Sequence, residues 1–128
     1  MKRRVHMGLF NGRKKFKGGA FYGFRDLGDG ADELLLFLSH VERTAAASGI
    51  EISGEPKRLD AGGFWFVYYP LADGGDLSID PRQLGPYADI DVHLDSKVGK
   101  DGWKRFMDAL GKSLESDAHF DDPRTPWK

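Results

Sequence analysis

The amino-acid sequence predicts an α+β domain, with a largely antiparallel sheet of about four to five strands and two amphipathic helices on one face. Three patterns support this class. Two segments repeat apolar residues at the spacing of a helix face, residues 64–69 are continuously apolar, and residues 89–95 alternate strictly between polar and apolar side chains. The order is roughly β-α-β-β-β-α, which is typical of helices packed on one side of an antiparallel sheet.

The two helices are predicted from complete apolar stripes. Each stripe has its members at i, i+3, i+4, i+7 and i+11, and the two sets are Leu34, Phe37, Leu38, Val41 and Ala45, and Trp103, Phe106, Met107, Leu110 and Leu114. Asp29 or Asp32 precedes the first stripe and Asp101 the second, so these acids are N-cap candidates. His40 lies off the first stripe and is therefore expected at the surface.

The strands are predicted from composition and alternation. Residues 20–24 form an aromatic strand candidate, and residues 57–60 resemble a short or edge strand. The run at 64–69 has no polar alternation, which favours a central strand covered on both faces and ended by Pro70. Residues 71–87 contain several glycines and prolines and are expected to form a loop, with room for one helical turn near Asp80–Leu84.

The predicted organisation is a basic N-terminal arm or hairpin at residues 1–19, a single α+β domain at 20–116, and an irregular tail at 117–128. Within the arm, residues 5–10 are a strand candidate followed by an Asn11-Gly12 turn. The first 17 residues contain seven Lys/Arg and no acid, whereas the remainder contains 12 Lys/Arg against 20 Asp/Glu. The charge is thus distributed unevenly along the chain.

The composition excludes several classes of protein. The chain has no cysteine, so it has neither disulfides nor a thiolate nucleophile, and a cytoplasmic location is expected. Its apolar runs are far too short to span a bilayer, so no membrane partner is expected. The GxxxxGK, GxGxxG and GxSxG motifs are absent, which argues against nucleotide binding and against a nucleophilic hydrolase.

The strongest chemical signal is the segment Asp-Ile-Asp-Val-His-Leu-Asp at residues 89–95. In a strand its polar side chains would share one face: Asp89, Asp91, His93 and Asp95. This row is the candidate surface for a protein partner, in particular a basic one. Asp89 and Asp91 are also candidate Mg²⁺ ligands, because Cα atoms two residues apart on a strand are roughly 6.6 Å apart. The alternative is the solvated side of an ordinary amphipathic strand.

The segment Tyr87-Ala88-Asp89-Ile90-Asp91-Val92 resembles the Asp-x-Asp strand of small nucleotidyltransferases, in which two acids hold the catalytic metal. The resemblance implies a divalent-metal-dependent enzyme with Asp89 and Asp91 as its ligands. The Gly-Ser motif that precedes this strand in that family is absent here.

The segment Gly63-Phe64-Trp65-Phe66-Val67-Tyr68-Tyr69 resembles the RNP1 strand of the RNA-recognition motif, and Phe21 lies where the RNP2 strand would place a stacking ring. The resemblance implies binding of RNA or single-stranded nucleic acid. In that case Phe21, Phe64 and Phe66 would stack on bases.

The basic arm would then contact phosphates through Arg13, Lys14, Lys15 and Lys17. Two positions depart from the RNP1 pattern. Gly62 stands where the motif has Lys or Arg, and Trp65 stands where it has Gly or Ala. Aromatic strand residues are also commonly buried in a core, which is the alternative interpretation of this segment.

The hypothesis that the sequence favours is a small non-enzymatic binding domain that acts through a protein partner, of the accessory or toxin-neutralising type, without a cofactor. Its support is the acidic body, the high aromatic content and the lack of a complete catalytic motif. Nucleic-acid binding and Mg²⁺-dependent catalysis at Asp89 and Asp91 are the two alternatives.

Overall fold

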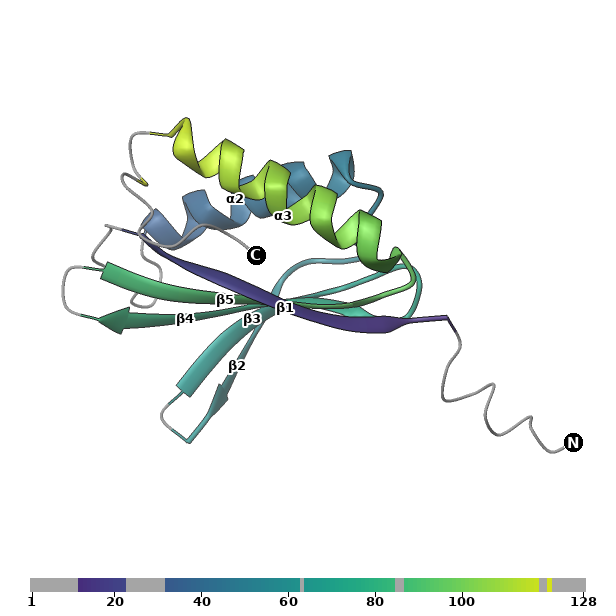
Figure 1. Cartoon of the computed structure of the whole chain (residues 1–128). Coiled ribbons are helices and arrows are strands. Elements are labelled where there is room, and N and C mark those ends of the chain that lie inside the picture. Colours follow the sequence, from purple (N-terminus) through teal and green to yellow (C-terminus); the bar gives the residue numbers. More distant parts are fainter. Residues whose placement is uncertain (1–11, 23–31, 63, 85–86, 118–119, 121–128) are drawn as a thin grey trace, which may run out of the picture.

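The computed structural model describes residues 12–22, 32–62, 64–84, 87–117 and 120. Its elements are β1 (Lys14–Tyr22), α2 (Asp32–Ala47), β2 (Lys57–Ala61), β3 (Phe64–Pro70), β4 (Asp76–Leu84), β5 (Tyr87–Ser96) and α3 (Gly99–Glu115). The five strands form one antiparallel sheet in the order β1-β5-β4-β3-β2, and both helices lie over the same face (Figure 1). The predicted α+β class and helix arrangement are confirmed.

The core lies between the helices and the three strands β3, β4 and β5, and Phe16 of β1 packs against its side. Both predicted stripes are buried in full, and they meet the alternate apolar residues of β4 and β5, which are Leu77, Ile79, Ile90, Val92 and Leu94. Fully burying a side chain of this size contributes about 1.5–3 kcal/mol, so these contacts hold the helices on the sheet. Neither described helix is both long and apolar enough to cross a membrane.

Strand β4 corrects the prediction of a loop at residues 71–87. Leu77 and Ile79 alternate with polar residues, and their burial outweighs the turn-forming composition around them. Proline has no backbone N–H to donate, so it is tolerated where a strand has a neighbour on one side only. The pairing of β4 with β3 ends at Ile79, and at Pro81 the strand pairs with β5 alone. The described part of the chain therefore has one strand more than the predicted order.

Strand β3 is not central and is not covered on both faces, contrary to expectation. It lies second from the edge of the sheet, between β4 and the edge strand β2. Val67 and Tyr69 are buried towards the helices, whereas Phe66 and Tyr68 are only half-buried. Residues 64–69 are therefore continuously apolar because one face of β3 is buried and the other carries aromatic side chains.

The two ends of the domain reach further along the chain than the sequence indicates. Strand β1 begins at Lys14, so residues 14–19 of the predicted basic segment pair with β5, while residues 5–10 and Asn11 lie outside the described residues. After α3, Phe120 is fully buried against Phe37 of α2, with ring centroids 6.0 Å apart. The tail therefore contributes to the core.

Asp73, in the turn between β3 and β4, links that turn to the end of β5. Its Oδ1 accepts a hydrogen bond from the Gly75 N–H at 3.0 Å. Its Oδ2 accepts from the Ser96 hydroxyl and from the Lys97 N–H, both at 2.8 Å. Partial burial alone would raise the pKa of Asp73, but these hydrogen bonds and the nearby Arg13 guanidinium lower it below the ordinary value of 3.8.

Because the pKa of Asp73 is lower in the folded chain than in the unfolded chain, its stabilisation is complete above about pH 4 and is lost as the pH falls through the folded-state pKa. Asp73→Asn should therefore lower the free energy of unfolding by roughly 2 kcal/mol at pH 7, and the deficit should shrink at pH 3. Urea unfolding of both proteins at the two pH values measures this.

The control for this measurement is Asp108→Asn, because the Asp108 side chain is exposed and, among the described residues, pairs with Lys112 across one helical turn. That variant should remain within about 0.5 kcal/mol of the wild type. A deficit of Asp73→Asn that is equal at pH 7 and pH 3 would show that its carboxylate charge does not stabilise the turn.

Candidate functional site on the open face of the sheet

The sheet has one face without a helix among the described residues, which we call the open face. The register of the strands places on it Lys15, Lys17, Phe66, Tyr68, Asp76, Ser78, Asp80, Asp91, His93 and Asp95. The predicted row on β5 is thus brought together with a second polar row on β4. Asp89 and Phe21 are paired in the register of β5 and β1, but their side chains lie outside the described residues.

Two pairs of carboxylates face each other directly across β4 and β5. Asp76 is the register partner of Asp95, and Asp80 is the partner of Asp91. Like charges in directly opposed positions destabilise a sheet. In the first pair this repulsion is offset by Arg13, whose Nε lies 3.4 Å from Asp95 Oδ1. Arg13, predicted as a phosphate contact, is therefore engaged within the fold.

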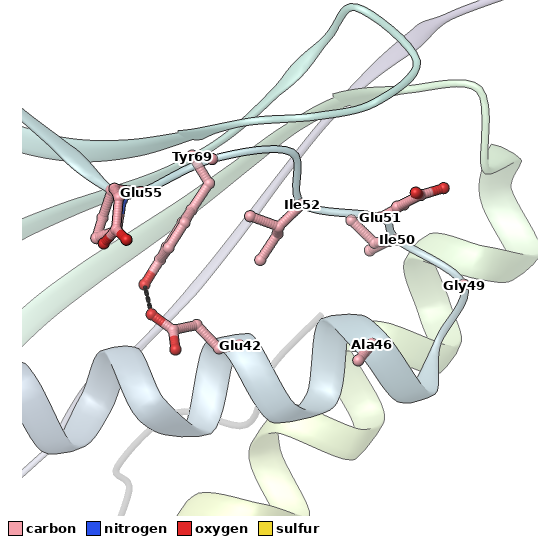
Figure 2. A pocket seen from close by; sticks show the side chains of 10 residues that line it. Glu42, Ala46, Gly49, Ile50, Glu51, Ile52, Glu55 and Tyr69 are labelled. Atoms are coloured by element: carbon pink, nitrogen blue, oxygen red, sulfur yellow. Dashed lines mark hydrogen bonds between the residues drawn. The ribbon is translucent and has the colours of Figure 1, made fainter.

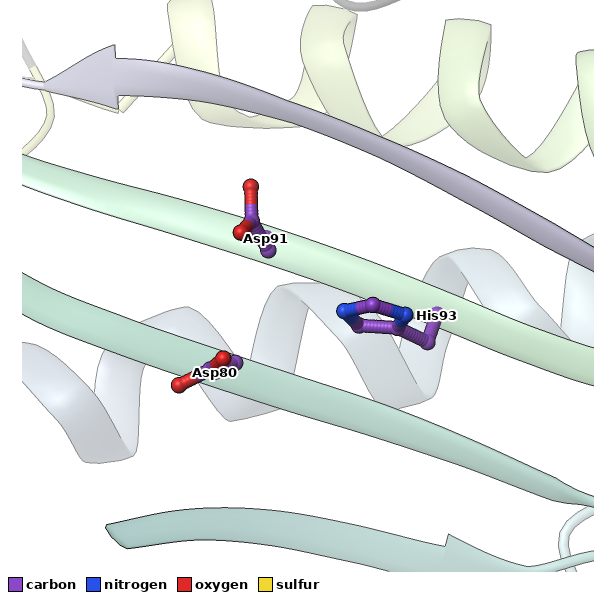
Figure 3. Close-up of side chains that lie close together, drawn as sticks. All are labelled: Asp80, Asp91 and His93. Carbon is purple, nitrogen blue, oxygen red and sulfur yellow. The ribbon is translucent and has the colours of Figure 1, made fainter. Parts of the chain in front are cut away.

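The second pair is joined by His93 in a three-residue cluster of potential metal ligands. One ligand atom from each of Asp80, Asp91 and His93 lies within 4.8 Å of the others, and all three residues are half-buried (Figure 3). The cross-strand partner of Asp91 is thus Asp80, which the composition of residues 71–87 places in a predicted loop. The alternation of Asp76, Leu77, Ser78, Ile79 and Asp80 is the signal that could have revealed it.

A groove of about 370 Å³ runs along this face beside the cluster. Its lining includes Asp80 and His93 of the cluster together with Lys15, Phe66 and Asp76. The groove combines apolar and aromatic side chains with several carboxylates. Such a surface suits a cation or a basic segment of a partner.

The arrangement of the aromatic strands differs from what the resemblance to the RNA-recognition motif implies. Strand β1, which carries Phe21, is separated from β3 by β5 and β4, and three strand spacings are roughly 14 Å. Phe66 and Tyr68 lie close together, with ring centroids 6.3 Å apart, but the acidic rows of β4 and β5 lie between them and β1. The side chain of Phe64 lies outside the described residues.

The lysines of the predicted nucleic-acid surface lie on the edge strand. Lys14, Lys15 and Lys17 are exposed on β1, with Lys15 and Lys17 paired in register with Asp95 and His93. Their charges therefore border the acidic rows and do not form a separate basic surface among the described residues.

A second pocket, of about 640 Å³, lies between α2 and the loop at residues 49–56 (Figure 2). Its central polar groups already contact each other, because the Tyr69 hydroxyl donates to Glu42 Oε2 at 2.7 Å. Burial, together with this hydrogen bond, raises the pKa of Tyr69, so the phenol remains a donor at neutral pH. We regard this pocket as a structural recess between the helix and the sheet.

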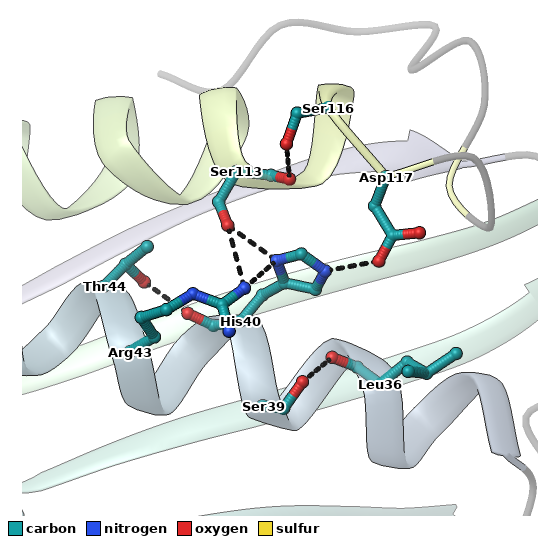
Figure 4. A network of polar contacts seen from close by, with 8 residues as sticks. All are labelled: Leu36, Ser39, His40, Arg43, Thr44, Ser113, Ser116 and Asp117. Carbon is teal, nitrogen blue, oxygen red and sulfur yellow. Dashed lines mark hydrogen bonds and ion pairs between the residues drawn. The ribbon is translucent and has the colours of Figure 1, made fainter.

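His40 joins the two helices to the tail, which corrects its predicted surface position (Figure 4). Its Nε2 lies 2.6 Å from Asp117 Oδ2, and its Nδ1 lies 2.6 Å from Ser113 Oγ. A serine, an imidazole and a carboxylate in line are the elements of a nucleophilic relay. However, Arg43 Nη2 lies 3.0 Å from Nδ1, the atom that a general base would need free, and neither pocket described above includes Ser113. The network is therefore a structural link.

The fold and the open face together define a small α+β domain with a mixed acidic and aromatic sheet surface. Comparison of the chain with models of protein families and with curated proteins finds no match. The functional assignment therefore rests on the residues of the open face.

Proposed function

We propose that this chain is a non-enzymatic binding domain that uses the open face of its sheet to bind a basic segment of a protein partner. One observation carries the proposal: four carboxylates oppose each other across β4 and β5, on a face that no described helix covers. Asp76 faces Asp95, and Asp80 faces Asp91. We further propose that it acts in the cytoplasm, for which the cysteine-free sequence is the support.

Two physical arguments favour this surface as a binding site. Directly opposed carboxylates are unfavourable in a sheet, and positions that break the rules of local stability are commonly functional. Within the fold Arg13 offsets the repulsion at Asp95, and lysine or arginine side chains of a partner would add further compensating charge. In addition, Phe66 and Tyr68 offer half-buried rings beside the charges, and aromatic residues of this kind contribute most to affinity in interfaces.

Affinity capture tests the proposal with the full chain immobilised and a cell lysate applied. Asp76→Asn combined with Asp95→Asn removes two charges from the open face without altering Asp80, Asp91 or His93. We expect a protein retained by the wild type to be recovered at least tenfold less with this double variant. Retention should also fall with added salt, because the contacts are electrostatic.

The matched control is Glu51→Gln combined with Glu55→Gln, which removes the same charge from exposed positions beside the other pocket. Recovery with the control should stay within about twofold of the wild type, in line with the small effect of distant charges in salt. Equal recovery with both double variants would exclude the open face as the interface. Recovery of nuclease-sensitive RNA in place of protein would favour the nucleic-acid alternative, which the acidic rows oppose through repulsion of phosphate.

A further inference from the structure

The donor atoms of Asp80, Asp91 and His93 converge from two neighbouring strands. Asp80 of β4 faces Asp91 of β5 directly, and His93 follows two residues later on the same face of β5 (Figure 3). The three ligand atoms lie within 4.8 Å of one another. Ligand atoms about 2.1 Å from a tetrahedral ion are roughly 3.4 Å apart, so small rotations of these side chains bring them to ligating positions.

Two of these side chains have no other polar contact within the described part of the chain. Neither Asp80 nor His93 forms a hydrogen bond or an ion pair with another described residue. Their nearest potential ligand partner is Asp91, within the cluster. The contrast with His40 is informative, because both ring nitrogens of His40 are engaged by neighbouring side chains. The contrast with Asp95 is similar, because Asp95 pairs with Arg13. The cluster at Asp80 thus combines opposed carboxylates with an imidazole that is free among these residues.

The backbone around the cluster leaves room for the Asp91 side chain. A Cβ atom at Gly19 on β1 would lie 2.8 Å from Asp91 Oδ1 and 2.7 Å from the Ile90 carbonyl oxygen. Glycine at this position therefore lets the two strands approach while Asp91 keeps its orientation on the open face. On the other side, Asp80 and His93 line the groove, which leaves an open direction for a water molecule or a ligand.

From these observations we propose that Asp80, Asp91 and His93 bind a divalent transition-metal ion of the Zn²⁺ type. An imidazole nitrogen with two carboxylate oxygens suits Zn²⁺, whereas Mg²⁺ prefers oxygen ligands alone and retains most of its water. The ion would neutralise the repulsion between Asp80 and Asp91, and its fourth position would face the groove. This inference does not rest on the proposed partner binding, since it concerns the isolated chain.

Isothermal titration calorimetry of ZnCl₂ into the metal-free full chain at pH 7.5 tests the site. We expect one ion to bind per chain with a Kd in the micromolar range, and Mg²⁺ to bind at least tenfold more weakly. His93→Ala and Asp80→Asn should each weaken zinc binding at least tenfold by removing one ligand. Zinc should also raise the melting temperature of the wild type but not of these variants.

Asp108→Asn is the control, because it removes an exposed carboxylate on α3, outside the cluster and outside the open face. Its zinc affinity should stay within about twofold of the wild type. His93→Gln provides a second variant with a more conservative side chain should His93→Ala fold poorly. Undiminished zinc binding by the folded His93 variants, or no binding by the wild type at 100 µM zinc, would overturn the proposal. Since the capture experiment alters Asp76 and Asp95 and this titration alters Asp80 and His93, each proposal can fail without the other.

Discussion

Replacing Phe120 with alanine is expected to lower the free energy of unfolding by about 3–5 kcal/mol, although the residue belongs to a tail without apolar periodicity. The Phe120 side chain is fully buried, and its ring meets Phe37 at 6.0 Å and His40 at 5.5 Å, both edge to face. Truncation would remove this aromatic packing and leave a cavity between α2 and the tail. Urea unfolding followed by tryptophan fluorescence measures the change.

Leu35→Ala is the control for this experiment, because Leu35 is a large apolar residue that is 59% exposed on α2. Its stability should remain within about 0.5 kcal/mol of the wild type, as is usual for exposed positions. A Phe120→Ala variant as stable as Leu35→Ala would show that the tail does not contribute to the core in solution.

The second large effect is expected at Gly75, immediately before β4. A Cβ atom at this position would lie 1.7 Å from the Asp95 carbonyl oxygen, a backbone atom of the neighbouring strand. Because a backbone atom cannot rotate away, β4 and β5 would have to separate where Asp76 and Asp95 pair. Gly75→Ala should therefore lower the free energy of unfolding by about 3 kcal/mol or more, measured by urea unfolding, or prevent soluble expression.

The control is Gly54→Ala, where the nearest atom to the added Cβ is Pro70 Cγ at 3.3 Å, part of a side chain. This change should alter stability by less than about 1 kcal/mol, since the reduced entropy of the unfolded chain partly offsets the tight contact. If the two alanine variants unfolded at the same urea concentration, the close approach of β4 to β5 at Gly75 would be refuted.

The parts of the fold that could be predicted are those in which local periodicity and burial agree. Both helix stripes and the row on β5 repeat at the period of their own element, so they identify the buried face without knowledge of its neighbours. The sequence does not reveal strand β4, because glycine and proline dominate its surroundings and its apolar alternation rests on Leu77 and Ile79 among the described side chains. Its stability comes from pairing with β5, which is a non-local interaction.

In the candidate site, too, the residues that lie on one strand could be predicted, and those brought together by strand pairing could not. The sequence identified Asp91, His93 and Asp95 as sharing a face, because they lie on one strand. It did not identify Asp80 as the partner of Asp91, because the register between two strands depends on their pairing and on the turn that joins them. The same holds for His40, whose burial depends on α3 and on Phe120, more than 70 residues away in the chain.

The amino-acid sequence alone determined the fold class, the two helices and the acidic row, since each follows from the alternation of side chains within one element. The tertiary structure decided which carboxylates oppose each other, which side of the sheet stays uncovered and which histidine is free among the described residues. These features depend on strand order and register, which arise from contacts between distant segments. The Asp80, Asp91 and His93 cluster exists only through that pairing.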